Sequence, residues 1–287
     1  MHITKGVIAA AGRGTRFLPS TKAVPKELLP IVDKPIIQYL VEEFISAGIK
    51  NIVIVTASER SPIRDHFRRS VVLERHLRNT GKPGLAKKIR EIADNVDITF
   101  IKQNGPYGNG TPCLNAAKLI GHEPFVYAFG DDLVLSKKSF TKQMLDAYKK
   151  KPGLYAGAQE VAKHEAHKYG IIKPSKHGQP REMSGIIEKP AAHRAPSNLA
   201  NIGRFILPPE IFPILARKKL GTGNELWLID AIDELVRQGC KAFYKKIEQG
   251  RWYTTGDPVN YLEAVRAFAL ASADYKNKVR HIFTTKY

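Results

Sequence analysis

Near its start the chain reads GVIAAAGRGTR (residues 6–16), an apolar run that passes into glycines and arginines. A buried strand followed by glycines and cations is how an α/β protein presents backbone N–H groups and positive charge to phosphate oxygens. Pro19, Pro25 and Pro30 come next and exclude a long helix. The stretch therefore predicts a strand that leads into a phosphate-binding loop at the edge of a sheet.

Two common phosphate-binding motifs do not fit this loop. A dinucleotide-binding fingerprint requires a third glycine where this chain has Phe17, and it requires a helix that opens at once. A P-loop requires Gly-Lys-Ser/Thr five residues after its first glycine, and Phe17-Leu18-Pro19 does not supply it. What is left is a long, proline-stiffened, cationic loop. Loops of this length in compact domains usually carry function, so we expect a binding loop and not an ordinary surface turn.

Length and composition favour a globular protein. A chain of 287 residues buries about 75% of its unfolded surface, and 43% hydrophobic with 25% charged residues is typical of soluble domains. No apolar run reaches the ~18 residues of a membrane span, and the first residues do not resemble a signal peptide. We therefore expect a cytoplasmic protein with no membrane partner. Cys113 and Cys240 form no CxxC motif, so neither a disulfide framework nor a zinc site is expected.

The formal net charge of +19 raises the question of nucleic-acid binding. The basic residues are scattered in short clusters, and no aromatic-interleaved motif accompanies them. We therefore expect a basic surface that attracts anionic nucleotides and no specific nucleic-acid partner. Nucleic-acid binding remains an alternative that rests on charge alone.

Helix and strand patterns alternate in the first half of the chain. Apolar residues from Ile36 follow a helical period that Gly48 stops. This alternation predicts a parallel sheet with helices on both faces. Buried strands are expected at 51–56, 96–101 and 125–129, and helices at about 61–93, 111–120 and 139–150.

After Gly153 the pattern changes to strands, which predicts a smaller mixed β region that forms the far wall of a cleft. Asn224 is expected to cap a helix that ends at Gly239. A strand at 242–247 and a final helix from 259 to about 275 follow. The expected strands of the β region are 154–161, 170–173, 185–189 and 199–207.

Two acidic residues, Asp131 and Asp132, follow the apolar run at 125–129 directly. In a parallel sheet the carboxyl end of a strand faces the ligand crevice. A carboxylate placed there suits a hard cation such as Mg²⁺. We therefore expect a magnesium-binding carboxylate at this strand end.

The loop also carries a resemblance. The segments AGRGTRFLP (11–19), KAVPKELLP (22–30) and DKP (33–35) resemble the bacterial UTP–glucose-1-phosphate uridylyltransferases, which are sugar nucleotidyltransferases. The resemblance covers nearly the whole chain. It implies an α/β fold with a Rossmann-like, mostly parallel (mixed) sheet flanked by helices and a smaller β-rich sugar-binding region, the nucleotide-diphospho-sugar transferase fold.

The same resemblance implies one nucleotidyltransferase domain over residues 1–287. Its parts are a nucleotide-binding half (1–152), a sugar-phosphate-binding half (153–257) and a C-terminal helix (258–287). Assembly as a homo-oligomer, a dimer or a tetramer, is also implied.

The implied activity is Mg²⁺-dependent transfer of UMP from UTP to glucose 1-phosphate, which gives UDP-glucose and pyrophosphate. The nucleophile is already an anionic phosphate oxygen, so the protein has to hold two anions in line and neutralise charge. Two alternatives stay open. One is a thymidylyl- or other nucleotidyltransferase that acts on another sugar 1-phosphate, and the other is a catalytically weak sugar-nucleotide sensor.

Site residues are carried over from the matching motifs. The resemblance gives catalytic roles to Arg16, Lys26, Asp131 and Lys189, with Asp131 as the metal ligand. GIIEKP (185–190) resembles the family's glucose-phosphate contact, in which the lysine holds phosphate as a point charge. The amide of Gln103 offers a donor and an acceptor to the uracil edge. The nucleotide-binding set is Ala11, Gly12, Gly14, Thr15, Glu27, Gln103 and Gly108, and the sugar-phosphate set is Gly170, Glu188, Lys189 and Ile202.

Three segments depart from the family pattern. A Gly-x-Gly-His segment has Thr111 in place of its histidine, and Leu-Thr-Asp-Ala-Ile has Ile229 in place of its threonine. Related enzymes carry an aspartate, often a second metal ligand, where this chain has Thr254. Either Asp257 or Asp230 replaces it, or water does, or Mg²⁺ binding weakens, because a hydroxyl is a poor substitute for a carboxylate at a hard cation.

Overall fold

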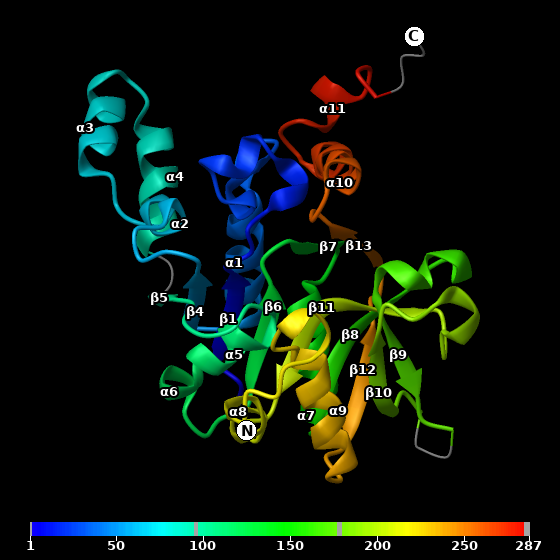
Figure 1. The fold of residues 1–287 in the computed structure, drawn as a ribbon. Helices are drawn as coiled ribbons and strands as arrows, with labels where there is room; N and C mark the ends of the chain where they lie inside the picture. The colour runs from blue at the N-terminus through cyan, green and yellow to red at the C-terminus, as the bar shows by residue number, and fades with distance from the viewer. Residues whose placement is uncertain (1, 95–96, 177–179, 284–287) are drawn as a thin grey trace.

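A computed structural model describes residues 2–94, 97–176 and 180–283. Its centre is a nine-stranded mixed sheet (Figure 1). The strands are β1 (Lys5–Ala10), β4 (Asn51–Thr56), β5 (Asp97–Lys102), β6 (Phe125–Phe129), β8 (Leu154–Glu160), β9 (Gly170–Pro174), β10 (Met183–Glu188), β11 (Leu199–Leu207) and β12 (Ala242–Lys246). Their order is β10-β9-β11-β6-β1-β4-β5, with β8 also paired to β11 and β12 paired to β8.

The parallel part of the sheet is the one that the sequence predicts. β6, β1, β4 and β5 run parallel, and Val7 of β1 lies between Tyr127 and Val53. Val7 and Ile8 are fully buried, as expected for a strand covered on both faces. β11 runs antiparallel to both β6 and β8, so the two predicted halves of the chain contribute strands to one sheet.

Two apolar clusters cover the two faces of the sheet. α1 (Ile36–Ala47), α7 (Phe140–Lys150) and α10 (Pro258–Ala271) belong to one cluster. α5 (Gly110–Asn115), α8 (Ile211–Ala216) and α9 (Leu228–Arg237) belong to the other. α3 (Val71–Asn79) and α4 (Pro83–Asp94) lie beyond the β5 edge of the sheet (Figure 1). The remaining helices are α2 (Pro62–His66), α6 (Ala117–Ile120) and α11 (Lys276–Val279). Within the described ranges, no helix is both long and apolar enough to cross a lipid bilayer.

Several predicted elements differ in their bounds. Asn224 does not cap α9, because it has a left-handed φ of 59° inside a short 3₁₀ turn, η6 (Thr222–Asn224), and the helix begins at Leu228. The helix expected at 111–120 is divided into α5 and α6. The last long helix ends at Ala271, before 275. Residue 96 of one predicted strand lies outside the described residues.

The loop after β1 contains no long helix, which confirms that prediction. It is built from the short turns η1 (Thr15–Phe17), η2 (Ser20–Lys22) and η3 (Lys26–Leu28), and it ends in a small ribbon, β2 (Pro30–Ile31) with β3 (Lys34–Pro35). Tyr261 of α10 holds the loop: its hydroxyl donates to the carbonyl of Pro30 at 2.6 Å, and its ring meets Phe17 edge-on. The C-terminal helix therefore supports the glycine loop.

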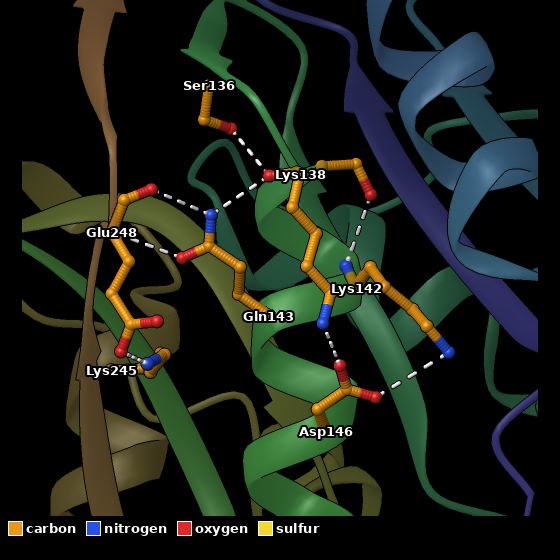
Figure 2. Close-up of polar contacts among 8 residues, drawn as sticks. Ser136, Lys138, Lys142, Gln143, Asp146, Lys245 and Glu248 are labelled. Carbon is orange, nitrogen blue, oxygen red and sulfur yellow. Dashed lines mark hydrogen bonds and ion pairs between the residues drawn. The ribbon is translucent and has the colours of Figure 1, made fainter.

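A second ribbon was not predicted from the sequence. β7 (Asp132–Ser136) pairs with β13 (Gly250–Thr254), which places Thr254 opposite Asp132. Gln143 of α7 fixes the chain just before β13: its amide nitrogen donates to the carbonyl of Glu248 at 3.1 Å, and its amide oxygen accepts from Glu248 N at 2.9 Å (Figure 2). This clamp sets where β13 begins, and with it the position of Thr254.

Candidate active site

The carboxyl ends of the parallel strands bring the predicted nucleotide residues to one edge of the sheet. Ala11 follows β1, Asp131 follows β6, and Gln103 follows β5, where its N–H donates to the carbonyl of Thr56 at 2.8 Å. A pocket opens at this edge. Seven of the predicted residues line it: Ala11, Gly12, Lys26, Glu27, Gln103, Gly108 and Asp131.

An ion pair lines this pocket. Lys26 Nζ is 2.6 Å from Asp131 Oδ2, and both side chains are about four-fifths buried, at 17% and 20% exposed. Burial acts to lower the pKa of Lys26, but the neighbouring acids, above all the charge and hydrogen bond of Asp131, outweigh it and raise that pKa above its usual range. The lysine is therefore a permanent cation. A Cβ at Gly12 would lie 3.2 Å from Lys26 Nζ, so the glycine lets the lysine lie close against the loop.

Arg16, Thr254 and the carboxylate of Asp131 lie around the backbone of Gly256. A Cβ at Gly256 would lie 3.1 Å from Asp131 Oδ2 and 3.6 Å from both Arg16 Nη1 and Thr254 Oγ1. The main chain of Asp131 is also held, because Thr255 donates to its carbonyl from the backbone N–H at 2.7 Å and from the hydroxyl at 2.9 Å. The strand end thus presents a carboxylate that is paired with Lys26, and Arg16 and Thr254 stand nearby around Gly256.

Asp132 serves as support and faces away from the pocket. Its Oδ1 accepts from Trp252 Nε1 at 2.7 Å, and burial together with the neighbouring Asp131 raises its pKa to about 7. Beneath it, the fully buried Arg204 donates to the carbonyl of Asp132 at 3.4 Å and to Glu43 Oε2 at 2.9 Å. This buried network fixes the turn that carries Asp131, the candidate metal ligand.

The residues at this site fit a magnesium ion that keeps water or phosphate ligands. Asp131 supplies one carboxylate and Thr254 a hydroxyl, and Mg²⁺ is commonly bound by one or two carboxylates with substrate phosphates. Asp257 does not replace the missing aspartate, because its Oδ1 caps α10 by accepting from Val259 N and Asn260 N, and its Oδ2 accepts from Asn260 Nδ2. Asp230 does not either, since it lies on α9 beside Gly221. Among the described residues, no group of three or more His, Cys, Asp or Glu could hold a metal.

Glu27 is a buried acid in the wall of the pocket. It is 1% exposed, and neither carboxylate oxygen has a hydrogen-bond partner in another residue of the described chain. Burial raises its pKa to about 7, against the attraction of Lys26. Glu27 therefore carries a proton for part of the time near neutral pH, and in that form it can donate a hydrogen bond as well as accept one.

The predicted sugar-phosphate residues gather where β9 and β10 meet. A Cβ at Gly170 would lie 2.9 Å from Glu188 Oε2, so a side chain there would press on the acid. Lys189 Nζ is 3.9 Å from Glu188 Oε1, and burial raises the pKa of Glu188 above its ordinary value. Ile202 has its side chain in the core, 1% exposed, and its role at this site stays a prediction.

Two further predicted residues, Gly14 and Thr15, lie in the loop after β1. Gly14 has a φ of 61°, which favours glycine, and its carbonyl accepts from Thr21 Oγ1 at 2.7 Å. Thr15 is exposed at the start of η1. Their contacts with a nucleotide stay predictions.

The sequence analysis missed one wall of the pocket. Glu225 and Trp227 line it together with Tyr107 and Asn109. The predicted helix began after Asn224 and therefore included Glu225 and Trp227. For this reason these residues were not expected to line the pocket. The spacing Gly108-Asn109-Gly110 was a usable signal, since glycines on both sides of a polar residue indicate a close approach of two backbones.

Comparison with known proteins is consistent with this geometry. A family model described as nucleotidyl transferase matches residues 5–270. A UTP–glucose-1-phosphate uridylyltransferase of Bacillus subtilis (strain 168) is 40% identical over 278 residues, which cover 96% of this chain and 94% of the relative.

Solved structures of nucleotide-bound enzymes are also similar to this chain over nearly its whole length. A UDP-glucose pyrophosphorylase complexed with UDP-glucose has a TM-score of 0.83 and 38% identity, covering 94% of this chain and 100% of that one. A UTP-bound UGPase from Acinetobacter baumannii has a TM-score of 0.90 and 31% identity, covering 99% of this chain and 100% of the other.

The buried acid predicts a pH dependence. Folded Glu27 holds its proton up to about pH 7, whereas in the unfolded chain it ionises near 4.5, so the folded state binds more protons in this window. Its contribution to the free energy of unfolding therefore falls as pH rises from 4.5 through 7. Relative to the unsubstituted chain, Glu27→Gln should gain up to about 3 kcal/mol between pH 4.5 and 8.

Urea unfolding of both proteins at several pH values measures this difference. Glu263→Gln, an exposed glutamate on α10, is the matched control and should show no such gain. Parallel curves for Glu27→Gln and the unsubstituted chain would contradict the assignment of a proton to Glu27.

Proposed function

Because the chain belongs to the nucleotidyl transferase family, we propose that it transfers UMP from UTP to glucose 1-phosphate, producing UDP-glucose and pyrophosphate. The observation that carries this is the single pocket that joins the glycine loop, Gln103, Lys26 and Asp131. The relatives named uridylyltransferases match the chain over almost its full length, which supports the same substrates.

The nucleotide half of the site binds UTP. The amide of Gln103 and the buried carboxyl of Glu27 face the base, while the backbone of Ala11 and Gly12 approaches the nucleotide. Lys26 and Arg16 neutralise the triphosphate: Lys26 pairs with Asp131, and Arg16 lies near Gly256 on the same side of the site. The loop holds the leaving pyrophosphate on the same side as these cations.

The sugar half binds glucose 1-phosphate. Glu188 accepts hydrogen bonds from sugar hydroxyls, and Lys189 pairs with the phosphate. A phosphate oxygen of glucose 1-phosphate attacks the α-phosphorus of UTP. The bond between the α-phosphorus and the bridging oxygen breaks, and pyrophosphate leaves with that electron pair. Positioning and charge neutralisation supply the rate acceleration, since no covalent enzyme intermediate is needed.

Asp131 and Thr254 would hold a magnesium ion at the triphosphate. When bound, the ion neutralises phosphate charge that develops during transfer. With its carboxylate on the metal, Asp131 would no longer pair with Lys26, and the lysine would be available to the phosphates. The predicted homo-oligomer and the cytoplasmic location stay predictions.

Pyrophosphate release from UTP, glucose 1-phosphate and Mg²⁺ tests the function, with each component left out in turn. We expect release only when all three are present, and UDP-glucose as the second product. Replacing UTP with dTTP, and glucose 1-phosphate with other sugar phosphates, tests the alternative nucleotidyltransferases. Tight binding of UDP-glucose without any release would contradict the enzyme and indicate the sensor.

The hydroxyl of Thr254 leads us to expect weaker Mg²⁺ binding than a carboxylate at the same position would give. In Thr254→Asp a second carboxylate would stand beside Asp131, so the Mg²⁺ concentration for half-maximal activity should fall several-fold with turnover unchanged or higher. Thr254→Asn, similar in shape and uncharged, is the matched control and should show no fall. If the aspartate variant loses most activity while the asparagine variant keeps it, the metal is not held between Asp131 and Thr254.

A further inference from the structure

Residues 107–110, here called the base loop, contribute to the nucleotide pocket and are hydrogen-bonded to the start of α9. Gly110 N donates to the carbonyl of Leu226 at 2.8 Å, and Leu226 N donates to the carbonyl of Tyr107 at 2.8 Å. The side chain of Asn109 adds a third bond, because its Oδ1 accepts from Leu228 N at 2.8 Å. The two segments are more than 110 residues apart in the chain and meet as one unit.

The glycines on both sides of Asn109 make this meeting possible. A Cβ at Gly108 would lie 2.6 Å from Leu226 N, and one at Gly110 would lie 2.9 Å from Leu226 O. Asn109 is itself fixed to the sheet, since its carbonyl accepts from the hydroxyl of Tyr127 on β6 at 2.6 Å. The loop therefore approaches α9 with one side chain available for capping.

Asn109 takes the place of a local helix cap. Trp227 stands at the N-cap position of α9 and makes no side-chain capping bond. The first N–H groups of a helix have no partner inside the helix, and an amide oxygen satisfies one of them. Asn109 thus supplies from the base loop what the residues before α9 do not.

The body of α9 reaches the sugar-phosphate residues. Asp233 Oδ1 accepts from Ile186 N on β10 at 2.9 Å, two residues before Glu188. Ile229 Cδ1 lies 3.1 Å from the Cβ position of Gly170. Residues 228 and 233 are about 7.5 Å apart along the helix axis. One rigid helix therefore spans from the base loop to the strand that presents Glu188.

We infer that Asn109 is a positioning residue that, through α9, fixes the sugar-phosphate residues relative to the base pocket. Asp233 is the matching contact at the far end of the helix. The inference rests on the proposed function, because it concerns a ligand that fills both halves of the site. UDP-glucose is such a ligand, and a preorganised site binds it without the cost of aligning the halves.

The test compares the Kd of UDP with that of UDP-glucose by calorimetry. In Asn109→Ala, the ratio of Kd for UDP to Kd for UDP-glucose should fall about fivefold, which is the equivalent of one hydrogen bond. Asn109→Asp keeps the acceptor oxygen at a helix N-terminus and should restore the ratio. A purely structural defect would weaken both ligands equally and leave the ratio unchanged.

Substitutions of Asp233 provide a second, independent test, because this residue lies at the other end of the contact and not at the base loop. Asp233→Ala should lower the same ratio, and Asp233→Asn, which keeps an acceptor for Ile186 N, should restore it. Because both residues act through one helix, the double alanine variant should fall no further than the lower single variant. Thermal unfolding of each variant confirms that the fold is kept.

Two results would overturn the inference. One is an unchanged ratio in both alanine variants, and the other is a double variant whose losses multiply. If the unsubstituted chain makes UDP-glucose and the ratios still do not move, only this inference is wrong. If the unsubstituted chain neither makes UDP-glucose nor prefers it to UDP, the proposed function is wrong and the inference with it.

Discussion

The ion pair between Lys26 and Asp131 is the interaction on which the site depends. Both charged side chains are largely buried. If one partner is removed, the other is left as an uncompensated buried charge, which is costly. The lysine comes from the loop after β1, and the aspartate from the end of β6. In the absence of nucleotide the pair therefore joins the phosphate-binding loop to the sheet, and it keeps a cation and a candidate metal-binding carboxylate ready for the triphosphate.

The surrounding structure holds that pair in place from three sides. Arg204 and Trp252 bond to Asp132, and the β7–β13 ribbon places Thr254 opposite Asp132, the neighbour of Asp131. Tyr261 supports the loop from α10. Trp252 and Thr255 satisfy oxygens of Asp132 and Asp131, whereas Nε and Nη1 of the buried Arg204 have no hydrogen-bond partner among the described residues. The bonds that are made restrict the geometry of the strand end.

Sequence reasoning predicted the parallel core, the loop without a long helix and seven of the residues that line the nucleotide pocket. These follow from local patterns, such as the apolar run before Gly12 and the acid after β6. It missed the wall that contains Trp227, because the capping partner of α9 is Asn109, more than a hundred residues earlier. It also missed the β7–β13 ribbon, since its register depends on the clamp at Gln143 and not on a local motif.

The most direct measurement is the binding of UTP to Asp131→Asn, with and without Mg²⁺, alongside turnover. Without metal, removing the carboxylate frees Lys26 and removes a repelling charge, so UTP should bind about tenfold more tightly. Mg²⁺-dependent turnover should fall by about 100-fold or more. Tighter metal-free binding of UTP together with lower turnover would support the view that Asp131 both pairs with Lys26 and holds the metal. Weaker metal-free binding together with lost turnover, or no change in either, would contradict it.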